Sequence, residues 1–201
     1  MISLIIDTST DCALIALAKE DVVIGIKNIF TPKQLSKMLL QEVNTLLEEC
    51  QASLQEITYF AVGVGPGSYT GTRVGSVVAQ TLSFALNKPL LTFSSIKAFL
   101  PEEKDNWGWV MPAKSGNYYF LKKTDKHFYH KLLKREELIS QLTEIETVIC
   151  PDFESLAVPL NPHCNKQNPI LNPQLLAKIL HKKFLEGQFS LEAKAELIYL
   201  H

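Results

Sequence analysis

"GVGPGSYTGTRVGS", residues 63–76, contains five of the chain's nine glycines and one of its two arginines. The almost wholly apolar stretch of residues 57–64 is typical of a central β-strand covered on both faces. Residues 70–87 have the composition of a helix, which Ser68 or Thr70 can cap. The glycine–proline–glycine turn between strand and helix uses backbone conformations that only glycine adopts freely. This strand–loop–helix unit predicts an α/β fold.

The rest of the first half alternates in the same regular way. Short turns between three consecutive strands indicate an antiparallel meander. Right-handed crossovers to two parallel strands then complete a mixed sheet with flanking helices, as in the ribonuclease-H-like fold. The expected strands are residues 2–7, 12–18, 22–28, 57–64 and 88–93, and the expected helices are 32–50, 70–87 and a short one through Leu100.

The second half carries weaker signals. Strands are expected at 106–113, 117–123, 126–133 and 147–150, helices at 135–142 and 172–187, and a last strand at 195–201. Five prolines between residues 151 and 173 predict a loop-rich stretch. We expect two lobes, residues 1–100 and a smaller one at 101–201.

Bulk composition narrows the class of protein. A hydrophobic content of 46% and a net charge of −1 fit a soluble globular protein with no general attraction to nucleic acid or membrane. No apolar run reaches the ~18 residues of a membrane helix, and no secretory leader is evident. The four cysteines show no Cys-x-x-Cys pairing. They therefore fit reduced residues in the core of a cytoplasmic protein. Six lysines and Arg135 between residues 113 and 135 form either a solvated face or a site for an anionic partner.

The two long helices of the first half are unusually apolar. The helix at 70–87 has no charged residue from Val74 onward, and the helix at 32–50 spreads apolar residues over an arc of roughly 200°. Either the second half of the chain covers the helix at 70–87 or a partner does. We favour an obligate partner, because large apolar surfaces usually mark interaction sites.

The glycine loop also admits a second hypothesis, binding of an anion. Loops that open a helix present free N–H groups and the positive end of the helix dipole. The loop lacks the Walker and dinucleotide patterns, and no second phosphate loop opens the second half. An independent actin-like phosphotransferase or ATPase is therefore the alternative function, with weak nucleotide binding at Asp7, Thr8, Ser9, Gly65, Gly67 and Ser68.

No catalytic or metal-binding residue is predicted. The His-Glu-x-x-His pattern of metalloproteases is absent. Ser68 lies between a strand and a helix, but the Gly-x-Ser-x-Gly spacing of a hydrolase is missing. A capping role suits Ser68 better.

Four segments carry a resemblance to a known family. They are "LIIDTSTDCALIAL" (4–17), "GPGSYTGTRVG" (65–75), "NPQLLAKIL" (172–180) and "AELIYLH" (195–201). Together, in this order and spacing, they resemble the bacterial TsaB (YeaZ) family. The resemblance implies two actin-like (ASKHA) lobes and a role in making threonylcarbamoyladenosine in tRNA.

The same resemblance implies partners and a surface. TsaB proteins are non-catalytic scaffold subunits that need no cofactor, pair with the catalytic TsaD subunit and recruit the TsaE ATPase. They meet tRNA through the complex and can form homodimers when alone. Arg73 either braces the loop or reaches a partner carboxylate. The interface residues expected on the two helices are Leu35, Met38, Leu39, Glu42, Val43, Leu46, Tyr69, Thr70, Arg73, Val74, Val77, Val78 and Thr81.

Overall fold

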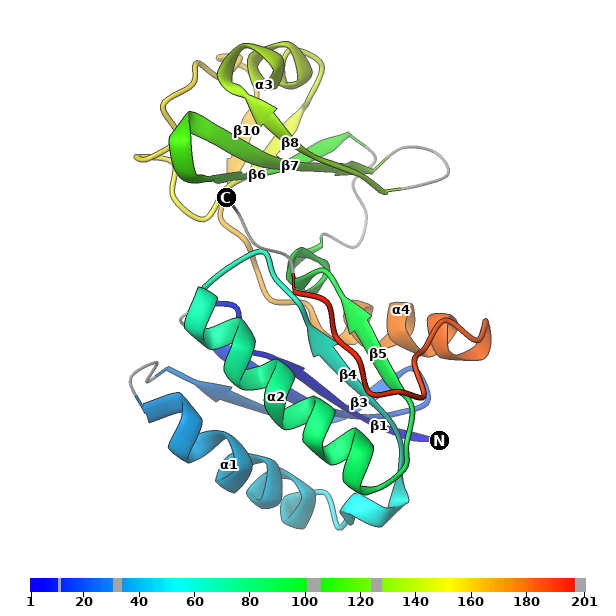
Figure 1. Cartoon of the computed structure of the whole chain (residues 1–201). Coiled ribbons are helices and arrows are strands. Elements are labelled where there is room, and N and C mark those ends of the chain that lie inside the picture. Colours follow the sequence, from blue (N-terminus) through cyan, green and yellow to red (C-terminus); the bar gives the residue numbers. More distant parts are fainter. Residues whose placement is uncertain (11, 31–33, 101–105, 124–127, 198–201) are drawn as a thin grey trace. The chain divides into compact units, whose positions relative to one another are not determined.

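The chain folds into two compact units, seen here in a computed structural model (Figure 1). The structure describes residues 1–10, 12–30, 34–100, 106–123 and 128–197. One unit comprises Met1–Ala98 together with Asn172–Tyr199, and the other contains Phe99–Leu171.

The first unit is built on a five-stranded mixed sheet in the order β3-β2-β1-β4-β5. β1, β2 and β3 are antiparallel neighbours, whereas β4 runs parallel to both β1 and β5. The expected meander followed by parallel crossovers is therefore confirmed. The strands are β1 (Ile2–Asp7), β2 (Ala13–Lys19), β3 (Val22–Ile29), β4 (Ile57–Gly63) and β5 (Leu90–Phe93).

Helices cover both faces of this sheet. α1 (Leu35–Glu49) and α2 (Tyr69–Ala85) lie side by side on one face (Figure 1). They pack against apolar side chains of β1, β2 and β4, such as Leu4, Ile15 and Phe60. α4 (Pro173–Leu185) lies on the opposite face, where Phe184 stacks on Tyr59 of β4 at 4.4 Å between ring centroids. Because apolar residues fill both sides of the central strands, β1 and β4 are almost wholly buried.

The C-terminal segment returns to the first unit. Beyond α4, Leu90 and Ser190 exchange two backbone hydrogen bonds of 2.9 Å at the free edge of β5. The division expected at residue 100 is therefore corrected at the C-terminal end, because residues from Asn172 onward pack with the first unit. The apolar face of α4 needs this sheet, since it buries Leu176 and Leu180.

The second unit has its own mixed sheet, in the order β10-β9-β6-β7-β8. β6, β7 and β8 form an antiparallel meander, and β9 and β10 add in parallel. α3 (Arg135–Leu142) packs on β7 and β8 over a separate apolar core that includes Phe120 and Leu138. The strands are β6 (Trp107–Pro112), β7 (Asn117–Lys123), β8 (Phe128–Lys134), β9 (Thr147–Ile149) and β10 (Asn165–Gln167).

Several element boundaries differ from expectation. β10 is a short strand within the proline-rich stretch that was expected to be rich in loops. Residues 195–197 of the expected last strand have no regular structure, and the rest of that segment lies outside the described residues. The short helix after β5 is a 3-10 helix, η3 (Ser95–Phe99). The start expected for α1 at residues 32 and 33 also lies outside the described residues.

Candidate functional site

The glycines of the loop serve close packing between α2 and the turn after β1. The Thr8 hydroxyl donates to the Gly71 carbonyl oxygen at 2.7 Å and accepts from the Gly75 amide at 3.1 Å. A Cβ at Gly71 would overlap the Thr8 carbonyl oxygen, and one at Gly75 would overlap the Thr8 hydroxyl. Because α2 approaches the turn so closely, only glycine fits at these two positions.

The start of α2 is held by its own residues and by the same turn. The Ser68 amide donates to the Ser9 carbonyl oxygen at 2.6 Å. The Ser68 side chain accepts from the Gly71 amide at 3.2 Å, which confirms Ser68 as the N-cap. A Cβ at Gly67 would overlap the Ser9 carbonyl group. The Ser68 and Gly71 amides, which an anion at the loop would use, are therefore already hydrogen-bonded within the protein.

Asp7 lies at the end of β1, directly below the loop. The residue is 4% exposed, and its Oδ1 accepts from the Ser9 amide at 2.9 Å. Burial raises the pKa of the Asp7 carboxyl above its ordinary value, and hydrogen bonds from Ser9 and Ser95 oppose the rise. The nearby Ser95 hydroxyl accepts from the Gly65 amide at 3.0 Å. Asp7 is thus a buried carboxyl group whose Oδ2 has no hydrogen-bond partner among the described residues.

Replacing Asp7 by asparagine should flatten the pH dependence of stability. In the wild type the unfolded chain loses the Asp7 proton near the ordinary pKa, 3.8, while the folded chain keeps it to higher pH. The free energy of unfolding therefore falls as pH rises through this window. Asp7→Asn should remove that fall and raise stability near neutral pH. Urea denaturation of both proteins between pH 4.5 and 8 measures how the free energy of unfolding depends on pH. An equal fall with pH in both proteins would contradict a raised pKa of Asp7.

α2 exposes apolar side chains on its outer side. Its fully buried residues are small or polar, Gly71, Thr72, Gly75, Ser76, Ala79 and Ser83, and partly buried Val74 and Val78 pack against the core beside them. Its exposed side carries large apolar residues, with Tyr69 54%, Val77 60% and Phe84 80% exposed. We name Thr70, Arg73, Val77, Thr81 and Phe84, which are exposed and recur at helical spacing, the α2 outer stripe. Exposed apolar side chains on one side of a helix are typical of a partner-binding surface.

α1 behaves as an ordinary amphipathic helix. Leu35, Leu39, Val43 and Leu46 are at most 6% exposed and belong to the core against the sheet. Their assignment to a partner surface is therefore corrected. The wide apolar arc is completed by Met38, which is partly buried against this core, and by Leu40, which is exposed.

The remaining expected interface residues are more accessible. Met38 and Glu42 on α1 and Val74 and Val78 on α2 are half-buried, and Val74 and Val78 pack against the core. Two exposed apolar residues of these helices were missed, Phe84 and Leu40, the latter 48% exposed. The signal for Phe84 was present in the sequence, because it follows Val77 by seven residues on the same helical face.

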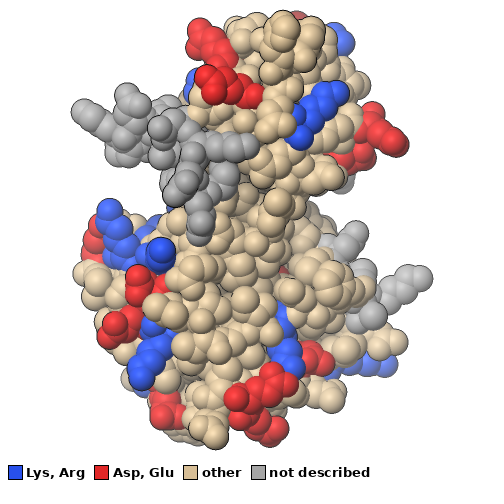
Figure 2. Space-filling model, turned by 180° about the vertical axis from the view of Figure 1, so that it is seen from behind, with Lys and Arg blue, Asp and Glu red and all other residues tan. Residues whose placement is uncertain are grey.

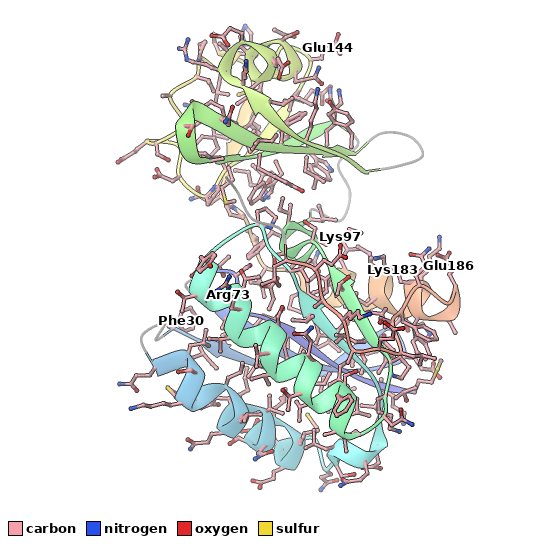
Figure 3. All side chains as sticks on the ribbon, viewed as in Figure 1. Phe30, Arg73, Lys97, Glu144, Lys183 and Glu186 are labelled. Atoms are coloured by element: carbon pink, nitrogen blue, oxygen red, sulfur yellow. The ribbon has the colours of Figure 1, made fainter. Side chains whose placement is uncertain are left out.

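Arg73 lies on the first half of α2 (Figure 3). Its guanidinium stacks on the Tyr69 ring at 4.0 Å from the centroid. Such a cation–π contact fixes the plane of the guanidinium at the surface. The group is therefore oriented on the same exposed side of α2 as Val77.

The lysine-rich stretch of residues 113–135 lies in the second unit. Lys122 donates to Gln141 at 2.8 Å, and the Arg135 guanidinium donates to the Ala157 carbonyl oxygen at 3.0 Å. On the face drawn in Figure 2, basic and acidic side chains are interspersed. These observations favour a solvated face over a concentrated anion site for the described part of the stretch.

Thiols and other ligand groups are dispersed. All four cysteines are free, and Cys150 is buried, which raises its thiol pKa. No three His, Cys, Asp or Glu residues gather into a metal-binding group within the described ranges. Among the helices that the structure describes, none is long and apolar enough to span a membrane.

The family model for "TsaD: tRNA N6-adenosine threonylcarbamoyltransferase" matches residues 23–130, more than half of the chain. Among curated proteins, the "tRNA threonylcarbamoyladenosine biosynthesis protein TsaB" of Bacillus subtilis is 34% identical over 122 residues. That alignment covers 59% of this chain and 53% of the relative. The protein of the same name from Haemophilus influenzae is 30% identical over 122 residues, covering 58% and 51%. The aligned part thus spans about half the length of these relatives.

Solved structures agree in fold. A Pseudomonas aeruginosa protein described as similar to peptidase YEAZ superposes with a TM-score of 0.82 at 22% identity, covering 100% of this chain and 99% of that one. YeaZ from Pseudomonas aeruginosa gives a TM-score of 0.78 at 20% identity, covering 98% and 100%. The expected two-lobed α/β fold is therefore confirmed. The chain belongs to the TsaB (YeaZ) family, within the wider family whose model is named for TsaD.

Proposed function

We propose that this chain is a non-catalytic scaffold subunit in the synthesis of threonylcarbamoyladenosine in tRNA. Its α2 outer stripe binds a TsaD-type catalytic subunit to form a heterodimer. The exposure of Val77 and Phe84 on α2 is the observation that carries the proposal. The pathway is proposed from the names of the curated relatives, which are threonylcarbamoyladenosine biosynthesis proteins. The TsaD-type partner is proposed from the resemblance of the sequence to the TsaB family.

The chemistry of the stripe suits a helix-to-helix contact. Val77 and Phe84 offer apolar anchors, and Arg73 offers a planar donor beside them. Aromatic residues and arginine are the side chains most enriched among residues that dominate binding energy. α2 carries no acidic residue, so a partner carboxylate opposite Arg73 would meet no repulsion from this helix.

A catalytic ATPase has less support in the geometry. Asp7 is 4% exposed and already accepts from the Ser9 amide, and the Ser68 amide donates to the Ser9 carbonyl oxygen. A nucleotide phosphate at this loop would have to displace these bonds. We therefore assign the loop to structure, and weak nucleotide binding there remains a prediction.

The other partners follow from the same role. We propose that a TsaE-type ATPase joins the heterodimer and that tRNA contacts the assembled complex. In the absence of the catalytic subunit, the α2 outer stripe of one copy would pair with that of a second copy, because the same apolar area stays exposed. The proposed site of action is the cytoplasm.

Reconstitution of the modification reaction tests the function. The TsaD-type and TsaE-type proteins of the same organism are mixed with tRNA, ATP and threonylcarbamoyl-adenylate, with or without this chain. Threonylcarbamoyladenosine is measured by mass spectrometry of the digested tRNA. We expect product only when the chain is present. Equal product without the chain would contradict the scaffold role, and product from the chain and tRNA alone would contradict the non-catalytic role.

A further inference from the structure

The segment between β9 and β10, drawn in yellow in Figure 1, lines a hollow in the second unit. The hollow has a volume of about 390 Å³. Sites that bind small molecules typically measure about 300–1,000 Å³. The hollow is therefore large enough to hold a small organic ligand, and its lining residues all belong to the second unit.

Apolar side chains form much of the wall of this hollow. Leu156 and Val158 are buried and belong to the apolar core of the second unit. Phe153 and Leu160 are partly buried against the same core. All four side chains line the hollow, so they would cover the apolar part of a ligand and remove it from water.

The side-chain polar groups at the hollow offer hydrogen-bond donors. The Lys166 amine lies over the Phe153 ring, 5.9 Å from the ring centroid, which places a positive charge beside the apolar wall. The Asn161 side-chain oxygen accepts from the His163 amide at 3.0 Å, and the NH2 group of Asn161 remains as a donor. The Cys164 thiol is free and also lines the hollow.

No acidic side chain balances Lys166 within the part of the chain that the structure describes. Lys166 has no ion pair there. Asp152 lies in the same segment, but its Oδ1 accepts from the Glu154 and Ser155 amides at 3.0 and 3.2 Å. Neither Asp152 nor Glu154 lines the hollow, and no other described Asp or Glu does. The hollow therefore combines apolar walls with one uncompensated cation.

We propose that this hollow binds a small carboxylic acid with an apolar body. The Lys166 amine pairs with the carboxylate in a charge-assisted hydrogen bond, and the Asn161 NH2 group donates to the same carboxylate. Because Lys166 is exposed, the carboxylate lies near the mouth of the hollow, and the apolar body packs inward on Leu156 and Val158. The site lies in the second unit, so it does not depend on the proposed role of α2.

Isothermal titration calorimetry of the full chain with sodium octanoate tests the site. The wild type should bind one octanoate saturably. Lys166→Met keeps the aliphatic stem and removes the charge, so it should weaken binding about tenfold or more. Lys131→Met is the matched control, because Lys131 is an exposed lysine of β8 in the same unit and does not line the hollow. This control should bind octanoate like the wild type.

Two further ligands separate the charge from the apolar contact. 1-Octanol has the same chain without a charge, so the wild type should bind it less tightly than octanoate. Lys166→Met should bind 1-octanol as the wild type does, because this ligand forms no ion pair. Tighter binding of 3-phenylpropionate than of octanoate would support the site and identify an aromatic acid as the preferred ligand. The reverse order would support it and identify an aliphatic acid.

Alkylation of Cys164 reports directly on the hollow. Saturating octanoate should slow the reaction of Cys164 with iodoacetamide and leave the rates of Cys12 and Cys50, which lie in the first unit, unchanged. Mass spectrometry of the digested protein measures all three rates.

The proposal is overturned by any of three results. These are absence of saturable octanoate binding by the wild type, equal weakening by Lys131→Met and Lys166→Met, and unchanged alkylation of Cys164. Should Lys166→Met fail to fold, the two ligands with the same chain decide on the wild type alone. Equal affinity for octanoate and 1-octanol would then overturn the pairing of Lys166 with a carboxylate, and tighter binding of octanoate would support it.

Discussion

Val77→Glu should abolish the complex with the TsaD-type subunit while leaving the isolated chain folded. Val77 is 60% exposed at the centre of the α2 outer stripe. A carboxylate there would be buried in an apolar interface without a partner. Central apolar anchors typically contribute about 2–4 kcal/mol, which is roughly a 30- to 1000-fold rise in Kd. Isothermal titration calorimetry against the catalytic subunit measures the change.

The matched control is an exposed apolar residue on another helix. Leu185 at the end of α4 is 65% exposed, so Leu185→Glu adds the same charge at similar exposure. It should leave Kd unchanged. Circular dichroism should show both variants folded, since neither position belongs to the buried core. Equal Kd values for Val77→Glu and the wild type would show that the stripe does not bind this partner.

Gly71→Val should destabilise the chain severely. A Cβ at Gly71 would overlap the Thr8 carbonyl oxygen, which is backbone and cannot rotate away. Relief requires α2 to move off the turn after β1, which would break the 2.7 Å bond from Thr8 and the 3.1 Å bond to it. We expect a loss of about 3 kcal/mol or more in the free energy of unfolding, combining overpacking with buried hydrogen bonds left unmade.

Urea denaturation with a neighbouring control isolates this effect. Thr70 is exposed one residue earlier on α2, so Thr70→Val introduces the same side chain without a clash. Its cost should stay below about 0.5 kcal/mol, as for most exposed substitutions. Similar losses at the two positions would contradict close packing with Thr8 as the reason for the glycine.

The sequence was most informative where local rules and packing agree. The run of apolar residues in β4, the turn after it and the Ser68 cap each follow from single residues. The absence of charged residues after Arg73 in α2 also predicted an accessible apolar surface, which Val77 and Phe84 provide. These features are local, so a single sequence is enough to read them.

Other features depend on contacts between distant segments. Periodicity on α1 could not tell whether Leu39 faces the sheet or a partner, because both surroundings are apolar. The return of α4 to the first sheet rests on contacts such as Phe184 with Tyr59, more than a hundred residues apart.

Hydrogen–deuterium exchange, with and without the TsaD-type subunit of the same organism, tests the central claim most directly. The account predicts slower exchange in peptides covering α2, with a smaller effect on α1, when the subunit is present. Peptides covering α4 should exchange at the same rate in both states. A stable complex that leaves α2 unchanged, with protection elsewhere on the chain, would contradict the assignment of this helix as the partner surface.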